Sequence, residues 1–436
     1  MKSSTLRVPF ALVLMCNAHA SPVGAYVPAE TPLPAPVAAP VDSFVVRALA
    51  QSPDVAELRA RLQAAREAVR GAGALPNPML ELMLQDVGFP TYTVGDVDMS
   101  MIGPQLTQTI PFPGKRGARR RAAEAGVTVR ERELEALRRD LVRDVRVLYA
   151  RAYALGIERQ ALVEGREALA SIAASARERY SAGSAESEPM IEARLAQQRL
   201  DVRLEDLDVE SSSTQLALRR LAGADDTQDF IWGRVTALPP TPEAEGFGTL
   251  DKSDEAAEVA VRAAETGAAE AELRAARIER LPDFVAGAGV GFRGSMDKVV
   301  TLRLGMDLPL WGGSETRAKA RVAEQQLLAA RAAERGALLS ARSDYTRLVH
   351  EGIRSQQQVA RYRDRIVPDS RLSYESARSN YMVGRGDFTA VLTNFQAWLD
   401  ARAELARREA EAYSNWAELA RLRNENGEAT NPGGAR

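Results

Sequence analysis

The chain has 436 residues, and 57 lysines and arginines nearly balance 59 acidic residues, which leaves a formal charge of −2 and gives no indication of nucleic-acid binding. Its single cysteine and two histidines nearly exclude a Cys/His metal site or nucleophile. Aromatic residues make up only 6% of the chain, a composition typical of long helices and not of a catalytic domain.

The first 20 residues have the pattern of an export signal. Lys2 and Arg7 precede an apolar run from Val8 to Met15, and Ala18-His19-Ala20 has the small-x-small form of a cleavage site. We therefore expect residues 1–20 to be removed and the mature chain to begin near Ser21. Residues 21–41 then form an extended arm, because six prolines disfavour helix there.

Cys16 leaves one alternative open. It could be the acylated cysteine of a lipoprotein, although Met15 is bulkier than the small residue that such processing prefers. If cleavage instead follows Ala20, Cys16 and His19 leave, and His350 is the only imidazole that remains. His350 lies in the middle of a helical pattern, so the sequence does not support the Ser/His/Asp triad that a hydrolase would need.

The rest of the chain contains one sequence pattern twice. Leu75-Pro76-Asn77 returns 206 positions later as Leu281-Pro282-Asp283, Ile110 returns 198 positions later as Leu308, and Gly183 returns 201 positions later as Gly384. Each copy reads as a helix, two strands and a long helical hairpin, which indicates a pseudo-symmetric architecture. We assign 42–224 to the first repeat, 225–252 to a linker, 253–424 to the second repeat and 425–436 to a disordered tail.

In the first repeat, two strands are predicted within about 78–110. Leu80, Leu82 and Leu84 occupy every second position, which gives the first strand one apolar and one polar face. The alternation is weak in the second strand, where Gly103-Pro104 predicts a bulge.

In the second repeat, two strands are predicted within about 283–308. Apolar side chains recur at every second position from Phe284 to Phe292 and again from Val300 to Leu308. The polar face of the second of these strands includes Arg303.

Four strands with one apolar face suit the wall of an outer-membrane β-barrel, whose strands need about 9 to 11 residues. After the signal, no apolar run reaches the roughly 18 residues of a membrane-spanning helix. Four strands do not close a barrel, and open edges in lipid leave backbone groups unsatisfied at several kcal/mol each. We therefore expect a homo-oligomer, with two hairpins on a soluble sheet as the alternative that period two alone leaves open.

The helical hairpins are predicted at 116–224 and 314–424. A helix from about Arg116 to Tyr180 has no internal proline and would extend about 95 Å. Apolar residues recur every seven positions, which predicts left-handed coiled coils. The three series are Leu134, Leu141, Leu148, Leu155, Leu162 and Leu169; Leu195, Val202, Val209 and Leu216; and Val391, Trp398, Leu405, Ala412 and Leu419.

Two motifs resemble a known family. Leu75-Pro76-Asn77-Pro78 and the run from Gln108 to Arg116, QTIPFPGKR, are similar to the TolC family of outer-membrane efflux proteins, especially the branch that serves heavy-metal resistance-nodulation-division (RND) pumps. The resemblance implies a mostly α protein with a small membrane β part. It further implies a homotrimer whose 12 strands form a barrel in outer-membrane lipid, continued as an α-helical barrel in the periplasm. A periplasmic adaptor and an inner-membrane RND pump would feed it.

The resemblance also places residues at the strand-to-helix junctions. Prolines there end strand pairing, glycines permit the turn into a helix, and aromatic rings suit the inner membrane interface. The junction residues are Pro111, Phe112, Gly114, Lys115, Arg116, Pro309, Trp311 and Gly312.

The tips of the helical hairpins correspond to the family's adaptor-docking ends, where glycine leaves room for a partner helix. The tip residues are Gly183, Ser184, Gly384, Arg385, Gly386 and Asp387. Where the best-known family member has gate aspartates, this chain has Ala390 and Thr393, so an acidic ring at the gate is not predicted.

The sequence thus predicts a passive exit duct for metal ions or small toxic compounds, not an enzyme. No catalytic, cofactor or metal site is predicted, and Met79, Met83, Met99 and Met101 are interpreted as gap-filling side chains. A periplasmic coiled-coil adaptor or scaffold of an export system is the alternative. An adaptor would need a lipoyl-like β domain inserted in one hairpin, and the pattern here is two hairpins without it.

Overall fold

The structure is a computed structural model that describes residues 40–181, 187–223, 235–241, 256–307 and 313–423. Gly183, Ser184, Pro309, Trp311 and Gly312 lie outside these ranges, as do the expected signal, almost all of the arm, most of the linker and the tail. What the sequence indicates at those positions stays a prediction. Among the described helices, none combines the length and the apolar character needed to cross a bilayer.

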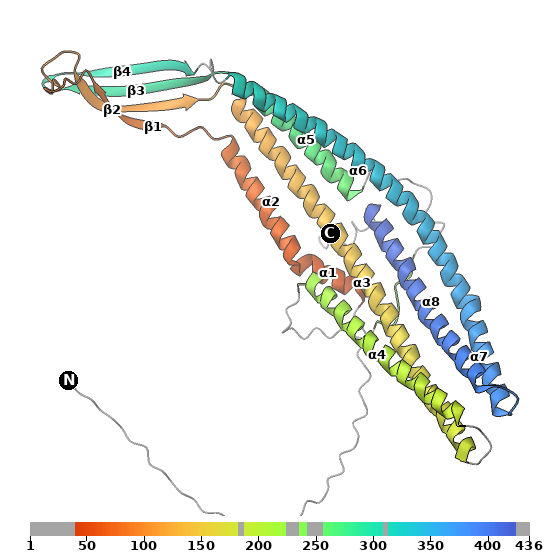
Figure 1. The fold of residues 1–436 in the computed structure, drawn as a ribbon. Helices are drawn as coiled ribbons and strands as arrows, with labels where there is room; N and C mark the ends of the chain where they lie inside the picture. Colours follow the sequence, from red (N-terminus) through yellow and green to blue (C-terminus); the bar gives the residue numbers. More distant parts are fainter. Residues whose placement is uncertain (1–39, 182–186, 224–234, 242–255, 308–312, 424–436) are drawn as a thin grey trace, which may run out of the picture. The chain divides into compact units, whose positions relative to one another are not determined.

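The elements follow the same order twice (Figure 1). The first set is α1 (Val41–Gln51), α2 (Pro53–Ala72), β1 (Met79–Gln85), β2 (Met101–Ile110), α3 (Lys115–Ser181) and α4 (Glu188–Leu221). The second set is α5 (Ala257–Ile278), β3 (Asp283–Arg293), β4 (Met296–Asp307), α6 (Gly313–Arg361), the π-helix η3 (Tyr362–Ile366), α7 (Val367–Met382) and α8 (Phe388–Leu422). The predicted fold, mostly helical with four strands from two repeats, is confirmed.

The four strands form one antiparallel sheet in the order β1-β2-β3-β4. Leu80 of β1 lies opposite Leu106 of β2, and Ala286 of β3 lies opposite Leu304 of β4. Ala286 lies 206 positions after Leu80, and Leu304 lies 198 positions after Leu106. These are the same offsets that separate the repeated sequence motifs. The duplication is therefore preserved in the strand register.

The bulge predicted at Gly103-Pro104 is wrong. β1 pairs with β2 in unbroken register along the whole of β1, and the irregularity lies instead between Gly291 and Arg293, where β3 meets β4. Gly103 has a different role, because a Cβ atom there would collide with the carbonyl oxygen of Val290. Glycine at this position permits the close approach of β2 and β3.

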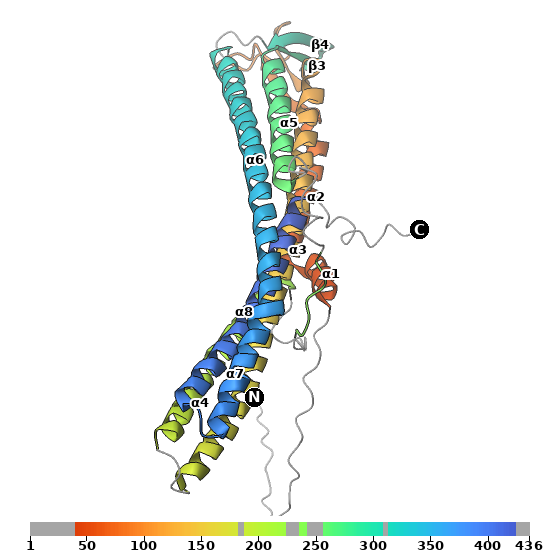
Figure 2. The ribbon, with the colours of Figure 1, turned by 90° about the vertical axis from the view of Figure 1, so that its right-hand side faces the viewer.

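α3 connects the sheet to the helical tips. Its 67 residues span about 100 Å at 1.5 Å per residue. It packs against α2 and α5 on the side nearer the sheet and against α4 and α8 farther along (Figures 1 and 2). The predicted heptad of α3 supplies this core, since Leu134, Leu141, Leu155, Leu162 and Leu169 are all buried.

The heptad predicted in α4 behaves differently. Leu195, Val202, Val209 and Leu216 are 46–72% exposed, whereas α4 buries the neighbouring positions Ala193, Ala196, Leu200, Leu204 and Leu207 against the rest of the chain. Within the described part of the chain this series therefore forms no core, and the coiled coil that its period predicts stays a prediction. α4 packs mainly on α3, so the face that carries the series is left uncovered.

No sequence pattern indicated the π-helix η3 at Tyr362–Ile366. Pro368 follows at the start of α7, where it lacks an N–H and its ring crowds the carbonyl four residues earlier, so a wider turn relieves the clash. Arg363 of η3 donates to Oε1 of Glu409 at 2.7 Å, and the Tyr153 hydroxyl donates to Oε2 at 2.5 Å. Glu409 of α8 thereby joins η3 to α3.

Candidate functional site

The first strand-to-helix junction is a tight turn between β2 and α3. β2 ends at Ile110 and α3 begins at Lys115. Gly114 has a φ of +99°, which glycine adopts without the strain that other residues suffer, and a Cβ atom there would lie 2.9 Å from Cδ1 of Ile278. The Ala118 N–H donates to the Gly114 carbonyl at 2.8 Å and so closes the first turn of the helix.

Lys115 forms the buried ion pairs of this junction. It is only 3% exposed, and its Nζ lies 2.8 Å from Oδ1 of Asp283 and 3.7 Å from Oε2 of Glu279. Oδ1 of Asp283 also accepts a hydrogen bond of 2.9 Å from the N–H of Phe112. Lys115 and Phe112 belong to the first repeat and both acids belong to the second. A buried ammonium is costly unless it is paired, so these charges hold the two repeats together.

Arg119, one turn farther along α3, strengthens the same contact. Its Nε and Nη2 donate to the two carboxylate oxygens of Glu279 at 2.6 and 3.0 Å. The hydrogen bond to Glu279 raises the pKa of Arg119 above its ordinary value, by more than partial burial lowers it. The rings of Phe112 and Phe284 stack beside these charges, with centroids 6.1 Å apart.

The structure brings the described junction residues of the prediction together. Pro111, Phe112, Gly114 and Lys115 share this turn, and Nε of Arg116 donates to the carbonyl oxygen of Gly73 at the end of α2. The sequence analysis did not identify Arg119, Glu279 and Asp283 as residues of this junction. A signal for one of them was present, because Asp283 ends the repeated Leu-Pro-Asn/Asp motif.

The second helical tip is described in full. Gly384 has a φ of +75°, its N–H donates to the Tyr381 carbonyl at 3.0 Å, and the Arg385 N–H donates to the Asn380 carbonyl at 2.9 Å. These two bonds form a Schellman motif that ends α7. The rings of Tyr381 and Phe388, 5.3 Å apart, close the base of the turn.

Asp387 has a local structural role at this tip. Its Oδ1 accepts a hydrogen bond of 3.2 Å from the N–H of Thr389, which caps the start of α8. Arg385, Gly386 and Gly384 are exposed, and a Cβ atom on Gly384 would meet nothing within 4 Å. The tip therefore presents an open, largely backbone surface, with Arg385 as its exposed cation.

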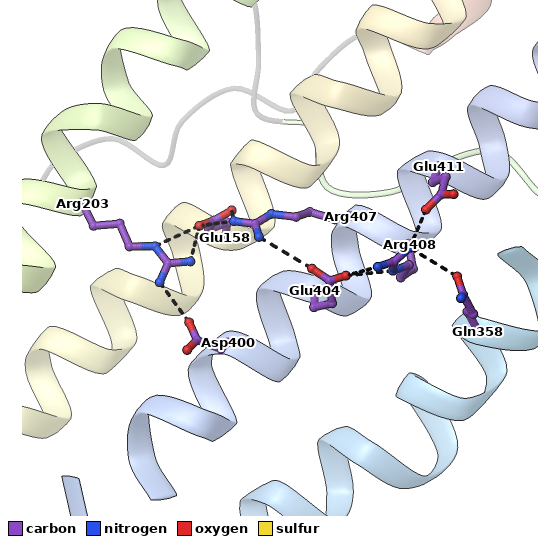
Figure 3. Close-up of polar contacts among 8 residues, drawn as sticks. All are labelled: Glu158, Arg203, Gln358, Asp400, Glu404, Arg407, Arg408 and Glu411. Carbon is purple, nitrogen blue, oxygen red and sulfur yellow. Dashed lines mark hydrogen bonds and ion pairs between the residues drawn. The ribbon is translucent and has the colours of Figure 1, made fainter. Parts of the chain in front are cut away.

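A third polar site joins α3, α4 and α8 between the junction and the tips (Figure 3). Glu158 of α3 is 3% exposed, and its carboxylate accepts hydrogen bonds from Arg203 of α4 at 2.6 Å and from Arg407 of α8 at 2.7 Å. Nη1 of Arg203 also donates a hydrogen bond of 2.9 Å to Oδ1 of Asp400. Sequence reasoning missed this site, because Glu158 reads as one more charge between the heptad leucines of α3.

The same network reaches a fourth helix. Arg408 of α8 donates to Glu404 and Glu411 on its own helix and to the side-chain oxygen of Gln358 on α6 at 3.3 Å (Figure 3). Glu411 also accepts from Arg354 of α6 at 3.1 Å. Polar contacts therefore fix the lateral positions of α4, α3, α8 and α6.

Replacing Glu158 with alanine is expected to lower the free energy of unfolding by about 2 kcal/mol, because Arg203 and Arg407 lose their common carboxylate while both stay partly hydrated. Glu164→Ala is the matched control, since Glu164 also joins α3 to α8, through Arg402 at 2.7 Å, but is 47% exposed. Chemical denaturation in detergent, followed by circular dichroism, measures both. Equal losses for the two variants would contradict a special role for the buried carboxylate.

Several solved structures of outer-membrane proteins share this fold. The outer-membrane channel OprN matches with a TM-score of 0.76 at 16% identity, over 88% of this chain and 89% of that chain. VceC of Vibrio cholerae matches with a TM-score of 0.73 at 18% identity, over 88% and 95%. The CmeC channel of Campylobacter jejuni matches with a TM-score of 0.75 at 15% identity, over 89% of each chain.

The fold is therefore that of an outer-membrane channel. The family described as outer membrane efflux protein matches residues 44–224 and 253–425, which is most of the sequence. This chain belongs to the outer membrane efflux protein family. A search among curated proteins finds no match to the sequence.

Proposed function

We propose that this protein is the passive exit duct of a tripartite efflux pump. It works as a homotrimer, in which 12 strands form a β-barrel in the outer membrane and the helices continue as a tube in the periplasm. A periplasmic adaptor docks at the tips and connects the duct to an inner-membrane RND pump. The pump supplies the energy, and the duct performs no chemistry.

The distribution of apolar side chains on the sheet carries this proposal. Leu80, Leu82, Leu302 and Leu304 are 64–88% exposed and share one face, because paired residues in a sheet point to the same side. The other face carries Glu81, Gln105, Thr107 and Arg303. An exposed apolar face opposite a polar one suits a wall between lipid and water. A periplasmic adaptor or scaffold would have no use for such a sheet.

The substrate class rests on the sequence motifs alone. The QTIPFPGKR junction is similar to the branch that serves heavy-metal RND pumps, so metal ions are the first candidate cargo and small toxic compounds the second. Minimum inhibitory concentrations of divalent metals and of organic toxicants, in cells with and without the chain, decide between them. Protection against organic compounds alone would remove the protein from the metal branch.

Cysteines at neighbouring positions of β4 test the membrane wall. In a Cys16→Ala background, Leu302→Cys should react with lipid-soluble maleimides and Arg303→Cys with a water-soluble maleimide, because successive side chains of a strand point to opposite faces. Labelling is measured by mass shift on membranes that contain the assembled protein. Equal labelling of both positions from water would contradict a membrane location for the sheet.

A further inference from the structure

Four arginines lie close together where α5 and α6 approach the sheet. The two helices run side by side up to the sheet (Figure 2). Farther from the sheet their contact is apolar, and Leu273 of α5 packs there with Ala323 and Leu327 of α6. Toward the sheet, residues on the same helix faces are arginines, since spacings of three and four keep residues on one face. This arginine cluster consists of Arg277 and Arg280 of α5 and Arg317 and Arg321 of α6.

The arginine cluster lines an open groove of about 570 Å³ between the two helices, a size typical of ligand pockets. Ser314, in the first turn of α6, and Glu324 also line it. The N–H groups at the start of α6 add the positive end of a helix dipole. Four cations, one acid and a hydroxyl group therefore share one groove.

The acid in the groove leaves most of this charge unbalanced. Oε1 of Glu324 lies 3.7 Å from Nη2 of Arg277, and both side chains are more than half exposed, so this pair is weak. Nε of Arg317 donates to a backbone carbonyl of its own helix at 2.6 Å, which is a neutral partner. Arg280 and Arg321 are exposed and have no ion pair within the described part of the chain.

The neighbouring acids are already paired with other cations. Glu279 binds Lys115 and Arg119 at the first strand-to-helix junction. Glu315, in the first turn of α6, pairs with Lys319 at 2.7 Å. Neither acid lines the groove. Like charges that face one another across two helices repel, so the cluster is balanced by an anion from outside the chain.

The first repeat shows that the cluster is not a requirement of the fold. Its helices α2 and α3 occupy the corresponding places, and they pack together without such a cluster. By the repeat offsets, the equivalents of Arg277, Arg280, Arg317 and Arg321 are Gly71, Ala74, Arg119 and Ala123. The one arginine among these equivalents, Arg119, is bound by both carboxylate oxygens of Glu279. The unbalanced charge is therefore specific to the second repeat.

The position of the cluster indicates which anion reaches it. Arg280 lies just before β3, which begins at Asp283, and Arg277 lies about 4.5 Å farther along α5. A headgroup layer extends about 5 to 8 Å beyond each side of the hydrocarbon core of a bilayer. If the sheet lies in the membrane as proposed, the cluster is at the depth of the lipid headgroups, which present phosphate.

We propose that the arginine cluster binds a phosphate group, and that its source is the headgroup of an anionic phospholipid in the periplasmic leaflet. A guanidinium group donates paired N–H groups in one plane, a geometry that matches phosphate oxygens. The phosphate site stands on the residues of the groove alone. Its lipid source rests on the membrane location in the proposed function.

A bound headgroup has a structural consequence at the second strand-to-helix junction. The position equivalent to Lys115, whose buried charge joins the two repeats at the first junction, is Gly313. A phosphate held by arginines of both helices bridges the end of α5 to the start of α6. The lipid thereby supplies a charged contact at a place where this chain has no buried ammonium.

Binding to the purified full-length protein in detergent tests the site. Native mass spectrometry in mixed micelles counts retained phosphatidylglycerol, with zwitterionic phosphatidylcholine as the comparison. The melting temperature in inorganic phosphate, against chloride at equal ionic strength, reports binding of a free anion, because a bound ligand stabilises the folded protein. Arg280→Gln with Arg321→Gln should weaken phosphatidylglycerol binding about 30-fold, or about fivefold for each cation.

Arg121→Gln with Arg132→Gln is the matched control. Both arginines are exposed on α3, lie outside the groove and have no ion pair among the described residues. The control loses the same charge as the cluster variant and should bind like the unmodified protein. A general electrostatic attraction would instead lower binding equally in the two double variants.

The outcomes separate the site, its ligand and the proposed function. Retention of phosphatidylglycerol over phosphatidylcholine, lost only in the cluster variant, would support a lipid headgroup. A phosphate effect lost in that variant, with no preference between the lipids, would support the site and overturn its lipid source. Equal binding by both double variants would overturn the site and leave the proposed duct intact. Labelling of Leu302→Cys and Arg303→Cys equally from water would overturn the membrane location without changing phosphate binding.

Discussion

Replacing Lys115 with methionine is expected to lower the free energy of unfolding by about 3 kcal/mol, the lower end of the range for loss of one partner of a buried ion pair. Methionine keeps much of the side-chain volume and removes the charge. Asp283 and Glu279 then lose the ammonium that balances them, although Asp283 keeps the Phe112 N–H and Glu279 keeps Arg119. Those remaining bonds keep the effect at the lower end. Chemical denaturation in detergent, followed by helical circular dichroism, measures the loss.

Lys319→Met is the matched control for this variant. Lys319 also pairs with a carboxylate at 2.7 Å, that of Glu315 on α6, but both side chains are exposed, and no measurable change is expected. Lys115→Met combined with Asp283→Asn should recover part of the loss, because one orphaned carboxylate is removed with its partner. Equal stability of the Lys115→Met and Lys319→Met variants would contradict the role assigned to the junction.

Replacing Gly384 with tryptophan is expected to abolish efflux and to leave the protein folded. The positive φ of +75° makes any larger residue strained by about 1 to 2 kcal/mol, but a side chain there meets nothing within 4 Å in the chain itself. The strain lies at the tip, far along the helices from the sheet. The indole would instead occupy the space that an adaptor helix needs if, as proposed, the adaptor docks here. Resistance of cells and the amount of oligomer extracted from the outer membrane are measured together.

Gly384→Asn separates the steric effect from the backbone effect. Asparagine tolerates the left-handed conformation better than other residues with a side chain, and it is far smaller than tryptophan, so resistance should persist. Equal loss of resistance in both variants would assign the effect to the backbone turn. Full resistance with tryptophan would remove this tip from adaptor docking, and loss of the oligomer itself would assign Gly384 to folding.

Much of the fold was predictable because local patterns determine it. Alternation at Leu80, Leu82 and Leu84 marks a strand with two different faces, and leucines every seven residues from Leu134 to Leu169 mark a helix with one buried stripe. The motif around Gly384 predicts a break between helices for the same reason, since glycine adopts a positive φ more readily than other residues. Repetition of the whole order then predicts the pseudo-symmetric architecture.

The candidate site was predictable only in part. Pro111, Phe112 and Gly114 stand out in the sequence because turn chemistry is local, whereas the partners of Lys115 lie more than 160 residues away. A charged residue in a sequence has the same appearance whether water or another helix surrounds it. Burial of Glu158 between Arg203 and Arg407 is accordingly invisible until three helices are placed.

The sequence by itself determined the strands, the long helices, the tip at Gly384 and the twofold repeat, because period, glycine and proline act within a few residues. Only the tertiary structure decided which of two similar heptads is core: Leu155 and Leu162 are buried, whereas Val202 and Val209 are exposed. It also decided that Gly103 serves a close strand approach without a bulge. The physical reason is the same in each case, since burial and collision depend on what a distant segment places against a residue.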